Sequence, residues 1–284
     1  MRYANLSGRL VLIGPGDVAL DVAHASGGEF GPEPQAIYER WDAFLSWART
    51  VTFEDARPFD RKCLEAPVPA PRQLFAVGLN YRDHASEVGQ EANDVPSVFT
   101  KFLSSITGPY AEVPHPGYGS VDWEVELVVV IGRQARRVGA ADAWSYVAGL
   151  TAGQDISERE LQHAGLVPQF SLGKSFPGFA PMGPWVVTPD ELPDPDDLEL
   201  RCTLNGEVVQ HARTSQMILS VGDLIARLSD VLTLLPGDVV WRVEIAFVGS
   251  SLCVAAVLAL MLRTTRMARD LGPAAARATS IGGF

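Results

Sequence analysis

Apolar residues along the chain fall mostly into short runs, separated by stretches rich in proline, glycine and aspartate. Runs of this kind predict β-strands, and they lie at 8–13, 74–78, 97–100, 124–131, 184–187, 198–204 and 239–247. Helical spacing of apolar residues or helix-favouring composition predicts helices at 34–49, 82–88, 141–144 and 218–228. Because strands and helices do not alternate regularly, the pattern predicts a β-rich α+β fold and disfavours a doubly wound α/β fold.

The same pattern divides the chain into three parts. Residues 1–70 are predicted to form a small N-terminal domain, in which Gly14-Pro15-Gly16-Asp17 makes a turn. A proline-stiffened connector then leads into a main domain at 71–241. Residues 242–284 are predicted to be an atypical C-terminal segment, with a strand remnant followed by an Ala- and Arg-rich stretch that is either helical or disordered.

Charge and cysteine content exclude several classes of protein. The chain carries 34 acidic and 23 basic side chains, a formal net charge of −11, which argues against a nucleic-acid partner because phosphate contacts need concentrated Lys and Arg. The longest apolar run, 247–262, is shorter than the roughly 20 residues that cross a bilayer. The start lacks the apolar core of a signal peptide, and the three cysteines are scattered. We therefore expect a cytoplasmic protein with no membrane partner.

Three acidic residues form a candidate metal site. Side chains alternate faces along a strand, so Glu124 and Glu126 point the same way at the start of the run 124–131. Asp155 follows another apolar stretch and is expected at a strand end. Carboxylates without Cys or His favour Mg²⁺ or Mn²⁺ over Zn²⁺. The alternatives are an edge strand with a solvated acidic face, and Asp155 as the cap of a helix that begins near Ser157.

Two further groups of residues are candidates for catalysis or substrate binding. His84 and Glu87 have i, i+3 spacing, so on a helix the carboxylate can orient the imidazole as a general base; the alternative is an incidental surface pair. Lys101 and Lys174 are single cations in apolar or glycine-rich surroundings. Each could hold a substrate carboxylate or a developing enolate oxygen, or be a surface lysine whose stem lies along the protein.

These motifs and their order resemble the fumarylacetoacetate hydrolase superfamily over about residues 70–241. The segments that carry the resemblance are 75–81 with His84 and Glu87, 96–101, 122–127, 153–157, 173–176 leading to 183–185, 204–210 and 235–240. The resemblance implies a β-rich roll or sandwich and, in most members, a homodimer. It also implies a Mg²⁺ ion, or Mn²⁺ or Ca²⁺, held by Glu124, Glu126 and Asp155.

The resemblance further implies roles for the other candidates. His84 and Glu87 activate water, and Lys174 helps to hold a 2-oxo acid substrate; Lys101, Gln210 and Tyr81 are the other expected substrate contacts. The implied reaction is metal-dependent hydrolysis of a C–C bond in an acylpyruvate-like 2,4-dioxo acid, in the breakdown of aromatic or sugar acids. An isomerase or decarboxylase of a related 2-oxo or 2-hydroxydienoic acid is the alternative.

The chain departs from the family pattern after Trp241. The family continues with a Thr-Gly-Thr-Pro type loop, whereas here Arg242-Val243-Glu244 follows at once. The change is interpreted as a deletion, a change of reading frame or a divergent tail. Since that loop contacts the substrate in the family, a catalytically impaired relative is the third hypothesis.

Overall fold

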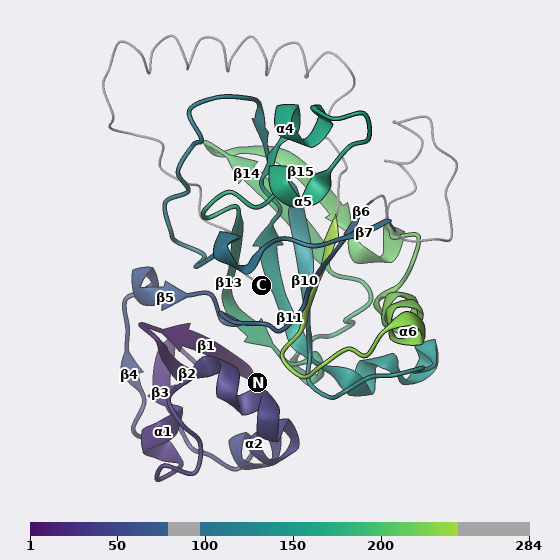
Figure 1. Cartoon of the computed structure of the whole chain (residues 1–284). Helices are drawn as coiled ribbons and strands as arrows, with labels where there is room; N and C mark the ends of the chain where they lie inside the picture. The colour runs from purple at the N-terminus through teal and green to yellow at the C-terminus, as the bar shows by residue number, and fades with distance from the viewer. Residues whose placement is uncertain (79–96, 244–284) are drawn as a thin grey trace, which may run out of the picture.

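The computed structural model describes residues 1–78 and 97–243, and a large mixed β-sheet forms its centre (Figure 1). The strands follow the order β4-β3-β2-β1-β13-β11-β10-β16-β6-β7, with β5 paired to β1 and β8 paired to β13. Two parallel pairs, β16 with β6 and β13 with β8, interrupt an otherwise antiparallel sheet. The predicted β-rich α+β class is confirmed.

Each predicted run overlaps a strand of the structure, whereas most of the other strands were not predicted. The large sheet contains β1 (Arg2–Leu6), β2 (Arg9–Gly14), β3 (Val18–Asp21), β4 (Arg57–Pro58), β5 (Leu64–Glu65), β6 (Leu74–Gly78), β7 (Ser97–Phe99), β8 (Ile106–Thr107), β10 (Val125–Ile131), β11 (Val147–Gln154), β13 (Ala180–Val187) and β16 (Val239–Val243). Two smaller ladders pair β9 (Val121–Asp122) with β12 (Ser157–Glu158), and β14 (Glu199–Leu204) with β15 (Glu207–Arg213).

The helical segments are short. The α-helices are α1 (Val22–Ala25), α2 (Trp41–Ala48), α4 (Arg159–His163), α5 (Phe170–Gly173) and α6 (Val221–Val231). The 3₁₀ segments are η1 (Pro34–Arg40), η2 (Arg61–Cys63), η3 (Leu103–Ser105), η4 (Ala140–Tyr146), η5 (Pro189–Glu191) and η6 (Thr214–Gln216). None of the helices within the described ranges is long and apolar enough to cross a membrane.

Strand β10 lies in the interior of the large sheet, between β11 and β16, and each of its two faces packs against a different hydrophobic core. Val128 and Val130 belong to a core with Phe44 and other aromatic residues of the N-terminal unit, residues 1–70. Leu127 and Val129 belong to a second core that includes Leu224, Ile225 and Leu228 of α6. All seven residues of β10 are buried, as expected for a strand covered on both faces. Even-numbered positions therefore face the N-terminal layer and odd-numbered positions face α6.

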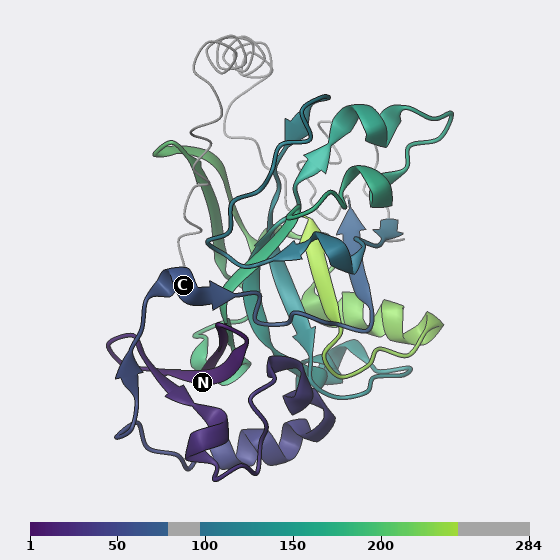
Figure 2. The same cartoon turned by 60° about the vertical axis from the view of Figure 1, so that its left-hand side comes forward.

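The N-terminal unit continues the main sheet. Tyr3 of β1 pairs with Val186 of β13, which joins the first strand to the half of the sheet that contains β10 and β11. Both views show the unit at one end of the central strands, and α4, α5 and the β14–β15 hairpin at the other (Figure 1 and Figure 2). The sequence pattern missed β1, because the buried Asn5 interrupts its apolar alternation; the Asn5 side chain donates to the carbonyl of Ala66 at 3.0 Å.

Three expected helices differ from the structure in bounds or type. The stretch predicted at 34–49 splits into η1 and α2, and Pro34 occupies the first turn of η1. The helix predicted at 141–144 is the 3₁₀ segment η4. The helix predicted to begin at Ile218 begins at Val221, because Ser220 and Asp223 form a reciprocal capping box there. The helix predicted at 82–88 and the tail beyond Val243 lie outside the described residues.

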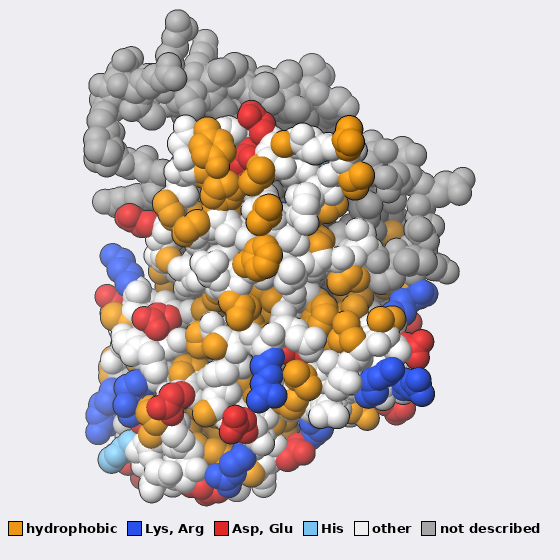
Figure 3. Space-filling view, in the orientation of Figure 1, with side chains coloured by type: hydrophobic (Ala, Val, Ile, Leu, Met, Phe, Trp, Pro, Cys, Tyr) orange, Lys and Arg blue, Asp and Glu red, His pale blue; other side chains and the backbone are white. Residues whose placement is uncertain are grey.

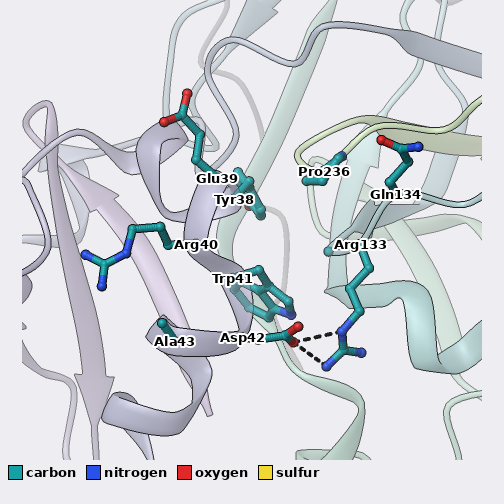
Figure 4. Close-up of a pocket in the computed structure, with 10 residues that line it drawn as sticks. Tyr38, Glu39, Arg40, Trp41, Asp42, Ala43, Arg133, Gln134 and Pro236 are labelled. Carbon is teal, nitrogen blue, oxygen red and sulfur yellow. Dashed lines mark hydrogen bonds and ion pairs between the residues drawn. The ribbon is translucent and has the colours of Figure 1, made fainter.

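A tightly packed junction joins the N-terminal unit to the end of β10. Trp41 lies against Gly132, and Arg133 pairs with Asp42, with Nε and Oδ1 2.7 Å apart (Figure 4). A pocket of about 430 Å³ opens beside this pair, and its lining includes none of the candidate site residues. A Cβ atom at Gly132 would lie 2.8 Å from the Trp41 Nε1 atom and 3.1 Å from the Ala148 Cα atom.

We therefore expect Gly132→Ala to destabilise the protein by about 1–3 kcal/mol, because the added methyl group would overlap Trp41 and Ala148. Thermal unfolding measures this as a lower Tm, by roughly 2–4 °C for each kcal/mol in a large domain. Gly139→Ala is the matched control, because its Cβ would meet only Asp142 Oδ2, at 3.7 Å. Equal Tm values for the two variants would show that the junction can relax around Trp41.

Candidate metal centre and active site

The pairing of β10 with β11 brings three carboxylates together. Glu124 directly precedes β10, Glu126 lies in it, and Asp155 directly follows β11. Glu126 is opposite Gly153 in the ladder, and the Asp155 backbone N–H donates to the Glu124 carbonyl at 2.8 Å. One carboxylate oxygen from each of the three side chains lies within 4.8 Å of the others. The exposed fractions of these residues are 2%, 0% and 0%, so the cluster is enclosed by protein.

The structural alternatives for these acids are wrong. Strand β10 is an interior strand between β11 and β16, so Glu124 and Glu126 are not the solvated face of an edge strand. Helix α4 begins at Arg159, and Glu158, not Asp155, is its cap, accepting hydrogen bonds from the N–H groups of Glu160 and Leu161. The chain after Asp155 first forms the short strand β12, which moves the helix start two residues beyond Ser157.

Lys101 and Lys174 contact the carboxylates directly. The Lys174 ammonium donates to Glu124 Oε2 at 2.7 Å and to Asp155 Oδ2 at 2.6 Å. The Lys101 ammonium pairs with Asp155 Oδ1 and donates to the carbonyl of Phe179 at 2.8 Å. Both lysines are at most 2% exposed, so their interpretation as surface lysines is wrong. Long cationic side chains are rarely buried this completely unless carboxylates pair with them.

The third cation of the cluster, Arg159, was missed by the sequence analysis. Its Nη2 atom pairs with Glu124 Oε1 and lies 2.7 Å from Asp122 Oδ2. Arg159 is the first residue of α4, where a positive charge opposes the helix dipole, but this helix start is known only from the structure. An arginine at such a position needs carboxylate partners, and the two acids at 122 and 124 supply them.

One aromatic ring lies beside each of the two lysines. The Lys101 ammonium lies 5.7 Å from the centre of the Trp241 ring, and the Lys174 ammonium lies 5.3 Å from that of Phe99. Phe99 stacks on Phe170 of α5 with ring centres 5.2 Å apart. A Cβ atom at Gly153 would lie 2.7 Å from Trp241, so glycine is needed where this ring crosses β11. Rings placed at these distances favour cations and exclude water.

The pKa shifts follow from burial and from these pairs. Burial, followed by the charges of Asp155 and Glu124, raises the pKa of Glu126 well above its usual value, although both lysines oppose the rise. Burial opposes ionisation of Asp155, but Lys101 and Lys174 outweigh it and lower the pKa of Asp155. Burial lowers the pKa of Lys101. The pKa of Lys174 is raised to about 12, because Asp155 and Glu124 outweigh the effect of burial.

Glu126 shows that the cluster fits a cation. Neither of its carboxylate oxygens has a hydrogen-bond partner within the described residues, although both are buried. An unpaired buried carboxylate is costly, and a hard divalent cation is the partner that three converging carboxylates suit. Since each carboxylate oxygen has two lone pairs, Glu124 and Asp155 can keep their Lys and Arg contacts and still bind a metal.

Of the remaining candidates, Gln210 contacts the backbone beside the cluster, and the others fall outside the described ranges. Gln210 on β15 is buried, and its Oε1 atom accepts from the backbone N–H of Val125 at 2.9 Å. This bond anchors the first residue of β10, and the contact with substrate stays a prediction. Tyr81, His84 and Glu87 lie outside the described residues, so the expected base and its carboxylate partner also stay predictions.

Comparisons with known proteins agree on one family. The profile of the fumarylacetoacetate hydrolase C-terminal domain matches residues 73–242. The human mitochondrial oxaloacetate tautomerase FAHD2A is 46% identical over 205 residues, which cover 71% of this chain and 65% of the human protein. The chain therefore matches slightly less than two thirds of the length of this relative.

Two solved structures are informative. A Mycobacterium smegmatis protein for which the name HpcE has been suggested is 56% identical, with a TM-score of 0.80 and 86% of each chain covered. The maleylpyruvate hydrolase of Sphingobium, solved with manganese(II) and pyruvate, is 28% identical, with a TM-score of 0.68 and coverage of 87% of this chain and 90% of that one.

The unequal pairing of the carboxylates predicts opposite effects of two substitutions on the metal-free protein. Glu126→Gln removes an unpaired buried charge and should raise the free energy of unfolding at neutral pH by about 1–3 kcal/mol. Glu124→Gln weakens two ion pairs and should lower it by on the order of 3–5 kcal/mol. Thermal unfolding in a chelator measures both, and a destabilised Glu126→Gln variant would show that a partner already neutralises this carboxylate.

The sign of the pH dependence follows from the raised pKa of Glu126. Below the unfolded-state pKa, this group is protonated in both states and the substitution changes little. As the pH rises, the unfolded chain ionises first, so the metal-free protein loses stability relative to Glu126→Gln. The advantage of the variant should therefore grow from acidic to neutral pH, and a constant difference would contradict this assignment.

Proposed function

The chain belongs to the fumarylacetoacetate hydrolase family, and from this we propose that it is a divalent-metal enzyme that tautomerises a 2-oxo dicarboxylic acid such as oxaloacetate. The observation that carries the proposal is the enclosed cluster of Glu124, Glu126 and Asp155 with Lys101 and Lys174 beside it. The 46% identity to a human oxaloacetate tautomerase supports this choice of reaction.

Glu124, Glu126 and Asp155 would hold the cation, proposed to be Mg²⁺ or Mn²⁺. When bound, the ion would act as a Lewis acid toward a chelating 2-oxo acid. Manganese(II) in the maleylpyruvate hydrolase structure supports a divalent ion in this family, and the all-oxygen donor set suits both metals.

The side chains of this chain would then act on the substrate's charge. Tautomerisation moves a proton between C3 and the 2-oxo oxygen, so negative charge develops on that oxygen. Lys174, fixed by Glu124 and Asp155, places a positive charge beside the cluster without further reorganisation. Lys101 fixes the other oxygen of Asp155. Trp241 and Phe99 lie beside the two ammonium groups, and both lysines are buried. We propose that His84 and Glu87 carry the proton.

A second reaction, hydrolysis of a 2,4-dioxo acid, uses the same arrangement. Its leaving group is the enolate of a 2-oxo acid, so Lys174 would oppose the same developing charge while water attacks the neighbouring carbonyl. The likeness to a maleylpyruvate hydrolase solved with pyruvate supports this candidate. The two reactions differ in whether a C–C bond breaks, and product analysis separates them.

We further propose a cytoplasmic homodimer. Exposed apolar side chains lie around α4, α5 and the segment before η3, including Phe102, Leu166, Val167 and Leu172. Figure 3 shows hydrophobic side chains over this upper part of the molecule, while charged side chains gather mainly on the lower part. An apolar surface of this kind supports association with a second copy, and light scattering of the purified protein measures the mass.

The proposal predicts that Mn²⁺ or Mg²⁺ accelerates the enol-to-keto conversion of oxaloacetate, followed by the loss of enol absorbance. Lys174→Met should lower kcat by about 10²–10³-fold, the effect of removing one positioned donor to a developing oxyanion. Lys62→Met is the matched control, because Lys62 is exposed and does not belong to the cluster. Metal-dependent cleavage of an acylpyruvate without tautomerisation would select hydrolysis, and no metal-dependent turnover of either substrate would contradict both.

A further inference from the structure

We propose that Asp122 is a positioning residue of the metal centre, and that it acts through Arg159 on the Glu124 carboxylate. This inference rests on the proposed metal centre, but not on which reaction the centre catalyses. Asp122 lies two residues before Glu124 and is not one of the three carboxylates that converge. Its contacts nevertheless determine where the Arg159 guanidinium lies.

Both carboxylate oxygens of Asp122 are engaged. Oδ1 accepts a hydrogen bond from the Trp123 backbone N–H at 2.9 Å. Oδ2 receives two hydrogen bonds from Arg159, from Nε at 3.0 Å and from Nη2 at 2.7 Å. A carboxylate that accepts hydrogen bonds from the next backbone N–H and from two nitrogens of one guanidinium has little rotational freedom.

The guanidinium is also held from its other side. Arg159 Nη1 donates to Oε1 of Gln162, a residue only 3% exposed, at 2.9 Å. Nη2 then reaches Glu124 Oε1. Arg159 thus uses Nε and both Nη atoms, and Asp122 and Gln162 together aim Nη2 at Glu124. Since a guanidinium is planar and rigid, fixing two of its edges fixes the third.

The backbone scaffold keeps Asp122 and Arg159 at a constant separation. Asp122 of β9 pairs with Ser157 of β12, two residues before Arg159. The Arg159 N–H donates to the Ser120 carbonyl at 2.8 Å, and the Glu158 side chain accepts from the Ser120 N–H at 2.8 Å. Main-chain hydrogen bonds therefore fix the register of β9 and β12, and the Asp122–Arg159 ion pair joins these two segments.

Asp122 also affects the charge that Glu124 experiences. Without Asp122, Arg159 would pair with Glu124 alone of these two carboxylates. The guanidinium would then compete more strongly with a metal for the Glu124 carboxylate. With Asp122 present, the charge is shared between two acids, and Glu124 keeps an oriented oxygen for the cation. Removing Asp122 should therefore weaken metal binding, as removal of an outer partner of a metal ligand commonly does, by about 10–100-fold.

The test measures the Kd for Mn²⁺ by isothermal titration and by electron paramagnetic resonance of free Mn²⁺, independently of turnover. We expect Asp122→Asn to raise this Kd by about 10–100-fold. Asp197→Asn is the matched control. Asp197 accepts hydrogen bonds from Arg213 Nε at 2.7 Å and Nη2 at 2.9 Å, and it is not one of the cluster acids. The control removes the same charge and should leave the Kd unchanged.

A double-mutant cycle tests whether Asp122 acts through Arg159. In an Arg159→Met background, Asp122→Asn should change the Kd less than twofold, because the intermediary is gone. An undiminished effect in that background would mean that Asp122 acts directly on the ion, which overturns the proposal. A wild-type Kd for Asp122→Asn overturns it as well.

A third variant keeps the proposal testable if Asp122→Asn does not fold. If the melting curve of Asp122→Asn shows no cooperative transition, Arg159→Lys takes its place, since one ammonium cannot reproduce the fork between Asp122 and Glu124. A higher Kd for Mn²⁺ in Arg159→Lys than in the wild-type protein supports the proposal, and an unchanged Kd overturns it. Failure of the tautomerase proposal is distinct, because it would appear as Mn²⁺ binding by the wild-type protein without turnover.

Discussion

The burial of three carboxylates at one point of the sheet is the constraint on which the rest of the structure depends. Like charges in a low-dielectric interior repel each other and lose their hydration, so the fold must bring positive charge to the same place. It does so from three separate segments: Lys101 follows β7, Lys174 follows α5, and Arg159 begins α4. Their cations pair with Glu124 and Asp155 at the ends of β10 and β11.

The position of the acids depends in turn on the packing of β10. Even-numbered residues of this strand face the aromatic core of the N-terminal unit, and odd-numbered residues face α6. A slip of one residue would exchange every side chain between these faces and would turn Glu126 toward α6. Burial on both faces of β10 therefore fixes its register against β11 and β16.

The sequence predicted the features that depend on local pattern. The period of two placed Glu124 and Glu126 on one face, and the apolar stretch before Asp155 placed that acid at a strand end. Burial of Lys101 and Lys174 could not be read in this way, since a single lysine is usually exposed and only its partners, distant in sequence, make burial tolerable. Arg159 and Asp122 were missed for the same reason: their role exists only once β9 pairs with β12. The family resemblance, by contrast, depended on many short motifs in order and was confirmed by the matched profile.

The balance of charge in this cluster supports the proposed dication and the proposed anionic substrate together. Asp122, Glu124, Glu126 and Asp155 face Lys101, Lys174 and Arg159, so with every group ionised one negative charge remains, and Glu126 is the acid without a partner. A monovalent ion would only neutralise the cluster. A divalent ion would leave it with a single positive charge inside a buried site, where long-range attraction is weakly screened. That excess would suit the proposed carboxylate-bearing 2-oxo acid. Each of the three protein cations would lower the affinity for the metal and raise the affinity for the anion.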